Sequence, residues 1–278
     1  MSLSILTNTS AMDTHRNLLA SSNAVSTAMQ RLSSGLRINS AADDAAGYAI
    51  SAGLTAQTNG LDQAGRNVGD AISMVQTADS ALNGIQNMLQ RARELTVQAQ
   101  NGSLQTSDRT AIQSEVNQLT DEIDREVNSV SFNGTTLLNG SAGNVQYQVG
   151  ANGNDTLKVN FGGSLETAMS AAAATVWSGG TVFDVTQNTT LGAIDNAIKA
   201  VSAQAATLGA AQNRLQYTSD AISATEQNLS ASNSRIKDVD MASEMTTMTQ
   251  QQVLQQAGTA MLAQANSQPQ MILKLISG

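Results

Sequence analysis

The chain has 278 residues, of which 41% are hydrophobic but only 3% aromatic, and its formal net charge is −8. This acidic balance disfavours a general affinity for nucleic acid or anionic membranes, because both require clustered Lys and Arg. The sequence contains no cysteine, which excludes disulfides, thiolate metal sites and cysteine nucleophiles. We therefore expect two or three units built on narrow aliphatic seams between helices, with no cofactor and no metal.

Two kinds of targeting segment are also disfavoured. The sequence has no run of 18 apolar residues, so we expect no transmembrane helix and no membrane insertion. The first 20 residues intersperse Leu, Ile and Met with polar residues, whereas a secretory signal needs a basic start and a continuous apolar core. If the protein is exported, we expect another route.

Residues 3–36 form the first amphipathic segment. Apolar residues recur there at steps of seven, four, three and four, which indicates one face of a helix. These residues are Leu18, Val25, Met29, Leu32 and Leu36. The opposite face is mostly uncharged and offers few ion pairs, so we predict that this end is poorly ordered until a partner covers its apolar stripe.

Residues 37–47 interrupt this rhythm with turn and N-cap residue types, which predicts a linker. A second helix is expected to begin near Asp43 or Asp44 and to run to about Gln100. Adjacent helical side chains point about 100° apart, so these two aspartates favour helix capping over acid–base catalysis. The helix carries a strict seven-residue repeat, typical of a coiled coil. This first ladder is Leu54, Leu61, Val68, Val75, Leu82 and Leu89.

The middle of the chain is less regular. Asn101-Gly102-Ser103 ends the long helix, and Ser107 or Asp108 is expected to cap a third one that packs back against it as an antiparallel hairpin. Its apolar face is Ile112, Val116, Leu119, Ile123, Val127 and Val130. An Asn-Gly turn follows at 133–134, and alternating apolar residues at 145–149 and 157–161 predict a β-hairpin.

A second ladder occupies the C-terminal part, in a helix expected from Leu191 to about Ile236. Its rungs are Ile194, Val201, Leu208, Leu215, Ile222, Leu229 and Ile236. A last amphipathic segment follows, and eight of the 11 methionines lie in 1–44 or 236–278. Met adapts to several packings, so these ends suit a contact surface with many neighbours. The C-terminal stripe includes Met245, Met248, Leu254, Met261, Ile272 and Leu275.

These patterns predict a mainly α fold: a long antiparallel helical bundle or coiled coil with a small β-hairpin region and paired N- and C-terminal helices. Catalysis is disfavoured, because His15 is the only histidine and no acidic partners are specified for it. The pattern alone favours a structural or interaction protein.

Five runs of residues resemble bacterial flagellin. They are LSSGLRINSAADDAAGYAIS at 32–51, LQRARELTVQ at 89–98, FNGTTLL at 132–138, VQYQVGA at 145–151 and SRIKDVDMASE at 234–244. The resemblance covers nearly all of 1–165 and 191–278 and indicates a short form without large outer domains. It implies an inner-tube coiled coil from 1–42 and 237–278, a helical bundle with a β-hairpin from 43–163 and 191–236, and a short variable surface insertion at 164–190.

The function that the resemblance implies is structural. The family's subunits polymerise helically into the extracellular flagellar filament used for swimming, after export by the flagellar type III apparatus, and no catalysis is implied. A hook–filament junction protein, which shares the terminal helices, is the alternative. A flagellin carrying a metalloprotease domain would need His-Glu-x-x-His, which a chain with one histidine cannot contain.

The resemblance also implies partners and modifications. The positions that match the family's Toll-like receptor motif are Arg91, Leu95 and Glu115; Leu95 is expected to fill an apolar hollow of the receptor, whereas the alternative is that these residues only join subunits. The helix at about 253–276 is similar to the segment bound by the family's export chaperone. Filament cap and hook-associated proteins are further expected partners. Candidate O-glycosylation positions are Ser164, Ser170, Thr175, Ser178, Thr181 and Thr186.

Overall fold

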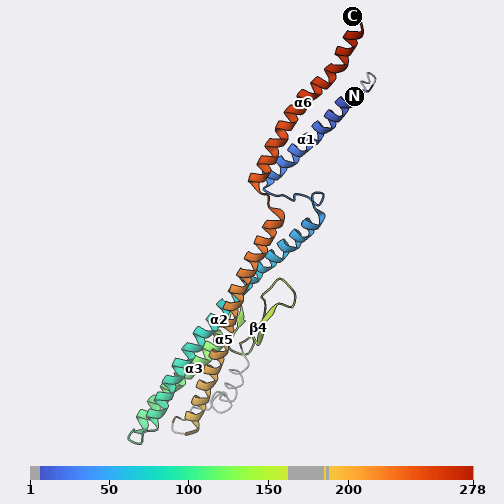
Figure 1. Cartoon of the computed structure of the whole chain (residues 1–278). Helices are drawn as coiled ribbons and strands as arrows, with labels where there is room; N and C mark the ends of the chain where they lie inside the picture. Colours follow the sequence, from blue (N-terminus) through green and yellow to red (C-terminus); the bar gives the residue numbers. More distant parts are fainter. Residues whose placement is uncertain (1–6, 162–184, 186–187, 278) are drawn as a thin grey trace. The chain divides into compact units, whose positions relative to one another are not determined.

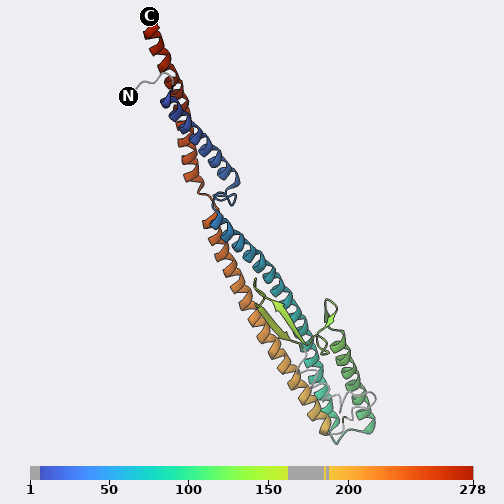
Figure 2. The same cartoon turned by 90° about the vertical axis from the view of Figure 1, so that its right-hand side faces the viewer.

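The computed structural model describes residues 7–161, 185 and 188–277, and it confirms the mainly α fold. The helices are α1 (Thr9–Ser34), α2 (Ala45–Ala99), α3 (Thr106–Ser129), α5 (Asn188–Lys237) and α6 (Met241–Ser277), and the strands are β1 (Ser131–Phe132), β2 (Thr135–Thr136), β3 (Asn144–Gln148) and β4 (Thr156–Asn160). Figures 1 and 2 show them in two views. The chain divides into a central unit, Gln57–Gln227, and a terminal unit, Met1–Ala56 with Asn228–Gly278.

In the central unit, α2 and α5 lie side by side and run antiparallel (Figure 2). Two contacts show the antiparallel direction. Arg93, late in α2, bonds Asp195, early in α5, whereas Gly65, earlier in α2, lies near Ile222, later in α5. The rungs of both ladders within this unit are buried. The end rungs in the terminal unit, which are Leu54, Leu229 and Ile236, are half-buried. The seven-residue repeat therefore builds the core of the central unit.

Helix α3 packs its predicted face against the same core, with Ile112, Val116, Ile123 and Val127 buried. The helix begins at Thr106 rather than after Ser107 or Asp108. Asp108 lies three residues inside the N-cap Gln105, and its carboxylate accepts a hydrogen bond from the Gln105 backbone N–H at 3.3 Å. The expected capping aspartate thus acts from within the first turn.

Two antiparallel hairpins complete the central unit. Asn133 (φ 47°) and Gly134 (φ 80°) both adopt the left-handed conformation between β1 and β2, which is why an Asn-Gly pair occurs there. Strand β3 pairs with β4 in the predicted hairpin. The hairpin is attached to α2 by Asn67, whose amide donates to Gln148 O at 3.0 Å, and to α5 by Gln204, whose amide donates to Asn160 O at 3.0 Å.

In the terminal unit, α1 and α6 are paired and antiparallel, as predicted. The Asn8 amide donates to Ala265 O at 2.8 Å near one end, and Arg31 and Glu244 are 3.6 Å apart near the other. The two connecting segments are joined by backbone hydrogen bonds from Arg37 to Lys237 and from Val239 to Gly35.

The predicted capping role is confirmed for Asp44, whereas Asp43 stabilises the turn before the helix. Asp44 Oδ1 accepts from the Gly47 N–H at 2.9 Å and caps α2, while Asp43 accepts from the backbone of Asn39 and Ser40 in the preceding turn. Those hydrogen bonds, with Ser40 contributing most, hold the pKa of Asp43 below its ordinary value. Among the helices that the structure describes, none is long and apolar enough to cross a membrane.

Candidate functional site

The contact between α1 and α6 is lined largely by small and polar residues. On each helix the inward positions recur at alternating steps of three and four. They are Ala11, Thr14, Leu18, Ser21, Val25, Ala28 and Leu32 on α1, and Glu244, Met248, Gln251, Gln255, Gly258, Leu262 and Ala265 on α6. Gly258 lies against Leu18, so close that an added Cβ would sit 3.4 Å from the Leu18 Cδ1 atom. Such residues let two helices approach closely but bury little apolar area.

Many large apolar side chains of this pair face outward, although Leu18, Val25, Leu32, Met248 and Leu262 face inward. Of the thirteen large apolar residues exposed among the described residues, eleven belong to the terminal unit and two, Val97 and Tyr217, to the central unit. Nine of the eleven lie on α1 and α6, and we call them the outer apolar surface. It consists of Met12, Leu19, Met29, Met241, Met245, Val253, Leu254, Met261 and Met271. This concentration of exposed apolar side chains on one pair of helices makes the pair a candidate interaction surface.

Two shallow grooves run along this surface and share Leu254. One, of about 570 Å³, lies between the helices and is walled by Leu18, Leu254 and Met261. The other, of about 540 Å³, lies along α6 and is walled by Met245, Val253 and Leu254. Leu254 is 47% exposed and Met261 is 61% exposed, so both side chains are available to a partner.

The terminal contact residues predicted from sequence divide between these two faces. Leu18, Val25, Leu32, Leu36 and Met248 are half-buried within the terminal unit. Those exposed on the outer apolar surface are Met29, Met245, Leu254 and Met261, whereas the side chains of Ile272 and Leu275 lie outside the described residues. The sequence pattern did not separate the half-buried residues from the exposed ones. The small residues that recur between the large apolar ones could have identified the inward face.

A second candidate surface lies where α2 and α3 meet. Arg91 donates from Nε and Nη2 to Glu115 Oε1, at 3.2 and 3.0 Å, and its Nη1 approaches Glu94 Oε2 at 3.5 Å. The hydrogen bond to Glu115 raises the pKa of the guanidinium above its ordinary value. Both partners are about half exposed, so the pair presents a fixed, solvent-facing charge pattern.

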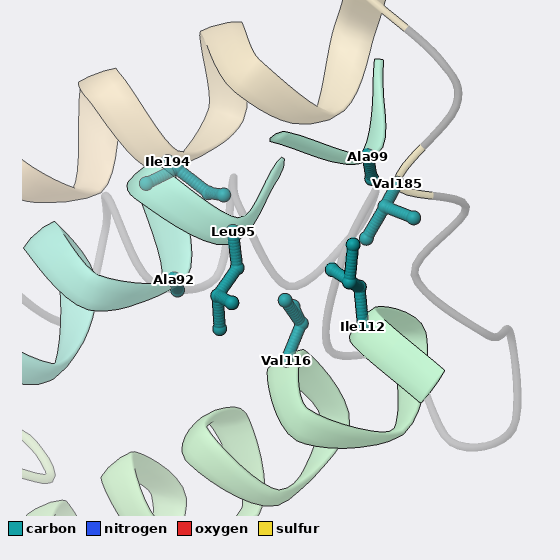
Figure 3. Close-up of a cluster of buried hydrophobic side chains, with 7 residues drawn as sticks. All are labelled: Ala92, Leu95, Ala99, Ile112, Val116, Val185 and Ile194. Carbon is teal, nitrogen blue, oxygen red and sulfur yellow. The ribbon is translucent and has the colours of Figure 1, made fainter. Parts of the chain in front are cut away.

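The structure corrects the expectation for Leu95. Its side chain is only 3% exposed and points toward Val116 in a buried cluster that also contains Ile112, Val185 and Ile194 (Figure 3). A side chain enclosed by its own core cannot fill a hollow on another protein. Leu95 instead supports the backbone that carries Arg91, while the recognition role of the site stays a prediction.

The sequence reasoning missed a neighbouring ion pair. Arg93 donates from Nε to Asp195 Oδ1 at 2.6 Å and joins α2 to α5. This bond raises the pKa of the Arg93 guanidinium. No local motif links two residues so far apart in sequence, and only the antiparallel register of the ladders could have suggested their proximity.

Within the described part of the chain, no three His, Asp or Glu side chains gather where they could hold a metal ion. The candidate glycosylation positions Ser164, Ser170, Thr175, Ser178, Thr181 and Thr186 lie outside the described residues.

Known proteins match this chain over most of its length. Residues 5–143 match the model of the bacterial flagellin N-terminal helical region, and residues 191–276 match that of the flagellin C-terminal helical region. A flagellin of Halalkalibacterium halodurans is 44% identical over 97% of this chain and 98% of its own length, and a flagellin of Bacillus subtilis is 41% identical over the same shares.

A solved structure of a proposed flagellar hook-associated protein from Vibrio parahaemolyticus shares the fold, with a TM-score of 0.58. It is 17% identical and covers 70% of this chain and 100% of its own, so it supports the fold alone and does not favour the junction-protein alternative. The two family models and the near-full-length relatives show that the chain belongs to the bacterial flagellin family, whose members are non-enzymatic structural subunits of the extracellular flagellar filament.

Proposed function

We propose that this chain polymerises through the outer apolar surface of α1 and α6 and that the resulting filament serves swimming motility. The observation that carries the proposal is that nine large apolar side chains are exposed on these two helices, whose mutual contact is lined largely by small and polar residues. The free energy of burying such side chains, about 25 cal/mol per Å², is then gained mainly on contact with another subunit.

The occupant that best fits the surface is a second copy of the chain. The 37 residues of α6 contain one acidic residue, Glu244, and one basic residue, Lys274, although the whole chain has a net charge of −8. Glu244 already pairs with Arg31. Copies can therefore approach along α6 without strong like-charge repulsion. A non-closing contact between one copy and the next extends into a helical polymer.

Loss of apolar area from the surface tests this proposal. The triple variant Met245→Gln, Leu254→Gln, Met261→Gln removes apolar side chains from both grooves and changes no buried residue. We expect a monomer with unchanged helical content that no longer pellets as filaments, and cells that no longer swim when it replaces the wild-type chain.

A matched control alters the same helix without removing apolar area. Thr247, Gln256 and Gln264 are also exposed on α6, and their triple substitution by Ala should leave pelleting and swimming intact. Normal filaments from the Gln variant would overturn the proposed surface. Normal filaments without swimming by wild-type cells would overturn the motility function alone.

A second proposed function is recognition of the monomer by a Toll-like receptor of a host. The observation that favours it is the exposed Arg91–Glu115 pair, which the sequence resemblance assigns to the receptor motif. Arg91→Ala should lower receptor signalling by purified monomer while polymerisation continues. Arg93→Ala is the matched control, because Arg93 is a similarly exposed arginine of the same helix that bonds α5 instead of α3. Equal signalling by both variants would exclude a specific role for Arg91.

The remaining partners stay proposals that follow from the family. The exposed residues Val253, Leu254, Met261 and Met271 would need cover before export, which supports chaperone binding at the C-terminal helix. Binding of the full chain to its export chaperone should weaken in the triple Gln variant. Cap and hook-associated proteins would contact the same terminal layers, proposed as 1–42 and 237–278. Measurement of the intact subunit mass from native filaments tests O-glycosylation. If the subunit is glycosylated, we expect added mass within residues 164–190.

A further inference from the structure

We infer that the exposed methionines of the outer apolar surface are a peroxide-sensitive modification site, whose oxidation to sulfoxides switches off assembly. The inference rests on the proposed function, because it assumes that this surface joins subunits. Six of the nine residues of the surface are methionines, each between 47% and 61% exposed. They are Met12, Met29, Met241, Met245, Met261 and Met271.

The distribution of sulfur in the chain directs oxidation to this surface. In the described part of the central unit, Met74 is 6% exposed and Met88 is half-buried. The chain has no cysteine, so no thiolate competes for the oxidant. Oxidation follows exposure, and the exposed thioethers of α1 and α6 are therefore expected to react first.

The chemistry is a two-electron oxygen transfer from a peroxide. The thioether sulfur attacks one peroxide oxygen, a sulfur–oxygen bond forms as the oxygen–oxygen bond breaks, and hydrogen peroxide leaves one water molecule. The sulfur loses two electrons and the peroxide gains them. A dithiol reductase reverses the step, yielding the thioether, water and a disulfide on the reductase.

The structural consequence falls in the two grooves. Met261 lines the groove between the helices and Met245 lines the groove along α6, so each receives a polar oxygen when oxidised. A sulfoxide oxygen is strongly hydrated in water, and the cost of removing that hydration when the groove is covered by another subunit opposes binding. The fold itself should be unaffected, because these side chains do not pack in a core.

The test compares three proteins, each as the full-length monomer treated with hydrogen peroxide. In the wild type, mass spectrometry should find sulfoxide at the six exposed methionines before Met74 and Met88. The concentration needed for filament formation should rise by about tenfold or more, which is the effect of one poorly accommodated polar group. Incubation with reductases for both sulfoxide epimers should restore the original concentration.

The two variants separate this site from damage elsewhere. One variant carries six substitutions that keep the apolar character: Met12→Leu, Met29→Leu, Met241→Leu, Met245→Leu, Met261→Leu and Met271→Leu. It should assemble equally well before and after peroxide. The control, Met74→Leu with Met88→Leu, should remain as sensitive as the wild type. Unchanged assembly of the fully oxidised wild type, or no recovery with the reductases, would overturn the inference. Failure of the untreated wild type to assemble would instead overturn the proposed function.

Discussion

Two single variants, one that truncates a leucine in the core and one that truncates a leucine on the surface, separate effects on folding from effects on assembly. Leu208 is a central rung of the second ladder and is 0% exposed, whereas Leu254 is 47% exposed on the outer apolar surface. Leu208→Ala removes buried carbons and leaves a cavity that the surrounding helices fill only partly. Leu254→Ala removes carbons from a side chain that is about half exposed in the monomer.

The magnitudes follow from this difference in burial. Leu208→Ala should lower the free energy of unfolding of the monomer by about 2–5 kcal/mol, the range for leucines in close-packed cores. That is a large fraction of the ~5–15 kcal/mol that stabilises a typical domain. Leu254→Ala should change it by less than about 0.5 kcal/mol, as expected for a surface substitution, but should raise the concentration needed for filament formation.

The assay is urea unfolding of both monomers followed by far-UV circular dichroism, with pelleting of filaments measured in parallel. Helices α2, α3 and α5 supply most of the helical signal, so the midpoint should fall for Leu208→Ala and stay constant for Leu254→Ala. A loss below about 1 kcal/mol at Leu208 would refute the claim that the ladder builds the core. Unchanged pelleting of Leu254→Ala would refute its place in the subunit contact.

Two further predictions concern the central unit. Gly60→Ala should destabilise this unit, because the added Cβ would lie 2.9 Å from the Cβ of Ala151. Gly84→Ala should instead stabilise α2 by about 0.5–1 kcal/mol, because its added Cβ meets nothing within 4 Å. Thermal unfolding of the two variants compares these effects. Burial raises the pKa of Tyr147 from 10.0 to about 12, so the folded chain favours the neutral phenol. The stability that comes from this preference should be complete below pH 10 and decline as the pH rises toward 12. The tyrosine resonance in NMR reports the midpoint of the titration.

Much of the fold was predictable because the ladders repeat strictly. Val68, Val75, Leu208 and Leu215 recur every seven residues, and all four are fully buried. Turn-forming residues were similarly informative, since the Asn-Gly turn occurs at the predicted position. The start of α3 was misplaced because Gln105 is an unusual N-cap residue, and its partner Asp108 resembled the cap itself.

The candidate sites were less predictable, because they depend on which neighbour a helix face meets. The spacing of Met29 and Leu32 placed both on one stripe, yet Met29 is exposed and the adjacent Ala28 is buried. Leu95 belonged to a motif that suggested a surface role, but its position relative to α3 encloses it. Hydrophobic periodicity finds apolar faces and does not distinguish a partner helix within the chain from one in the next subunit.

Electron microscopy of the purified chain, alone and after seeding, would show whether copies assemble through the outer apolar surface. We expect tubular helical filaments whose reconstruction shows Leu254 and Met261 packed against a neighbouring subunit. Absence of filaments after seeding, or filaments in which both side chains face solvent, would contradict it.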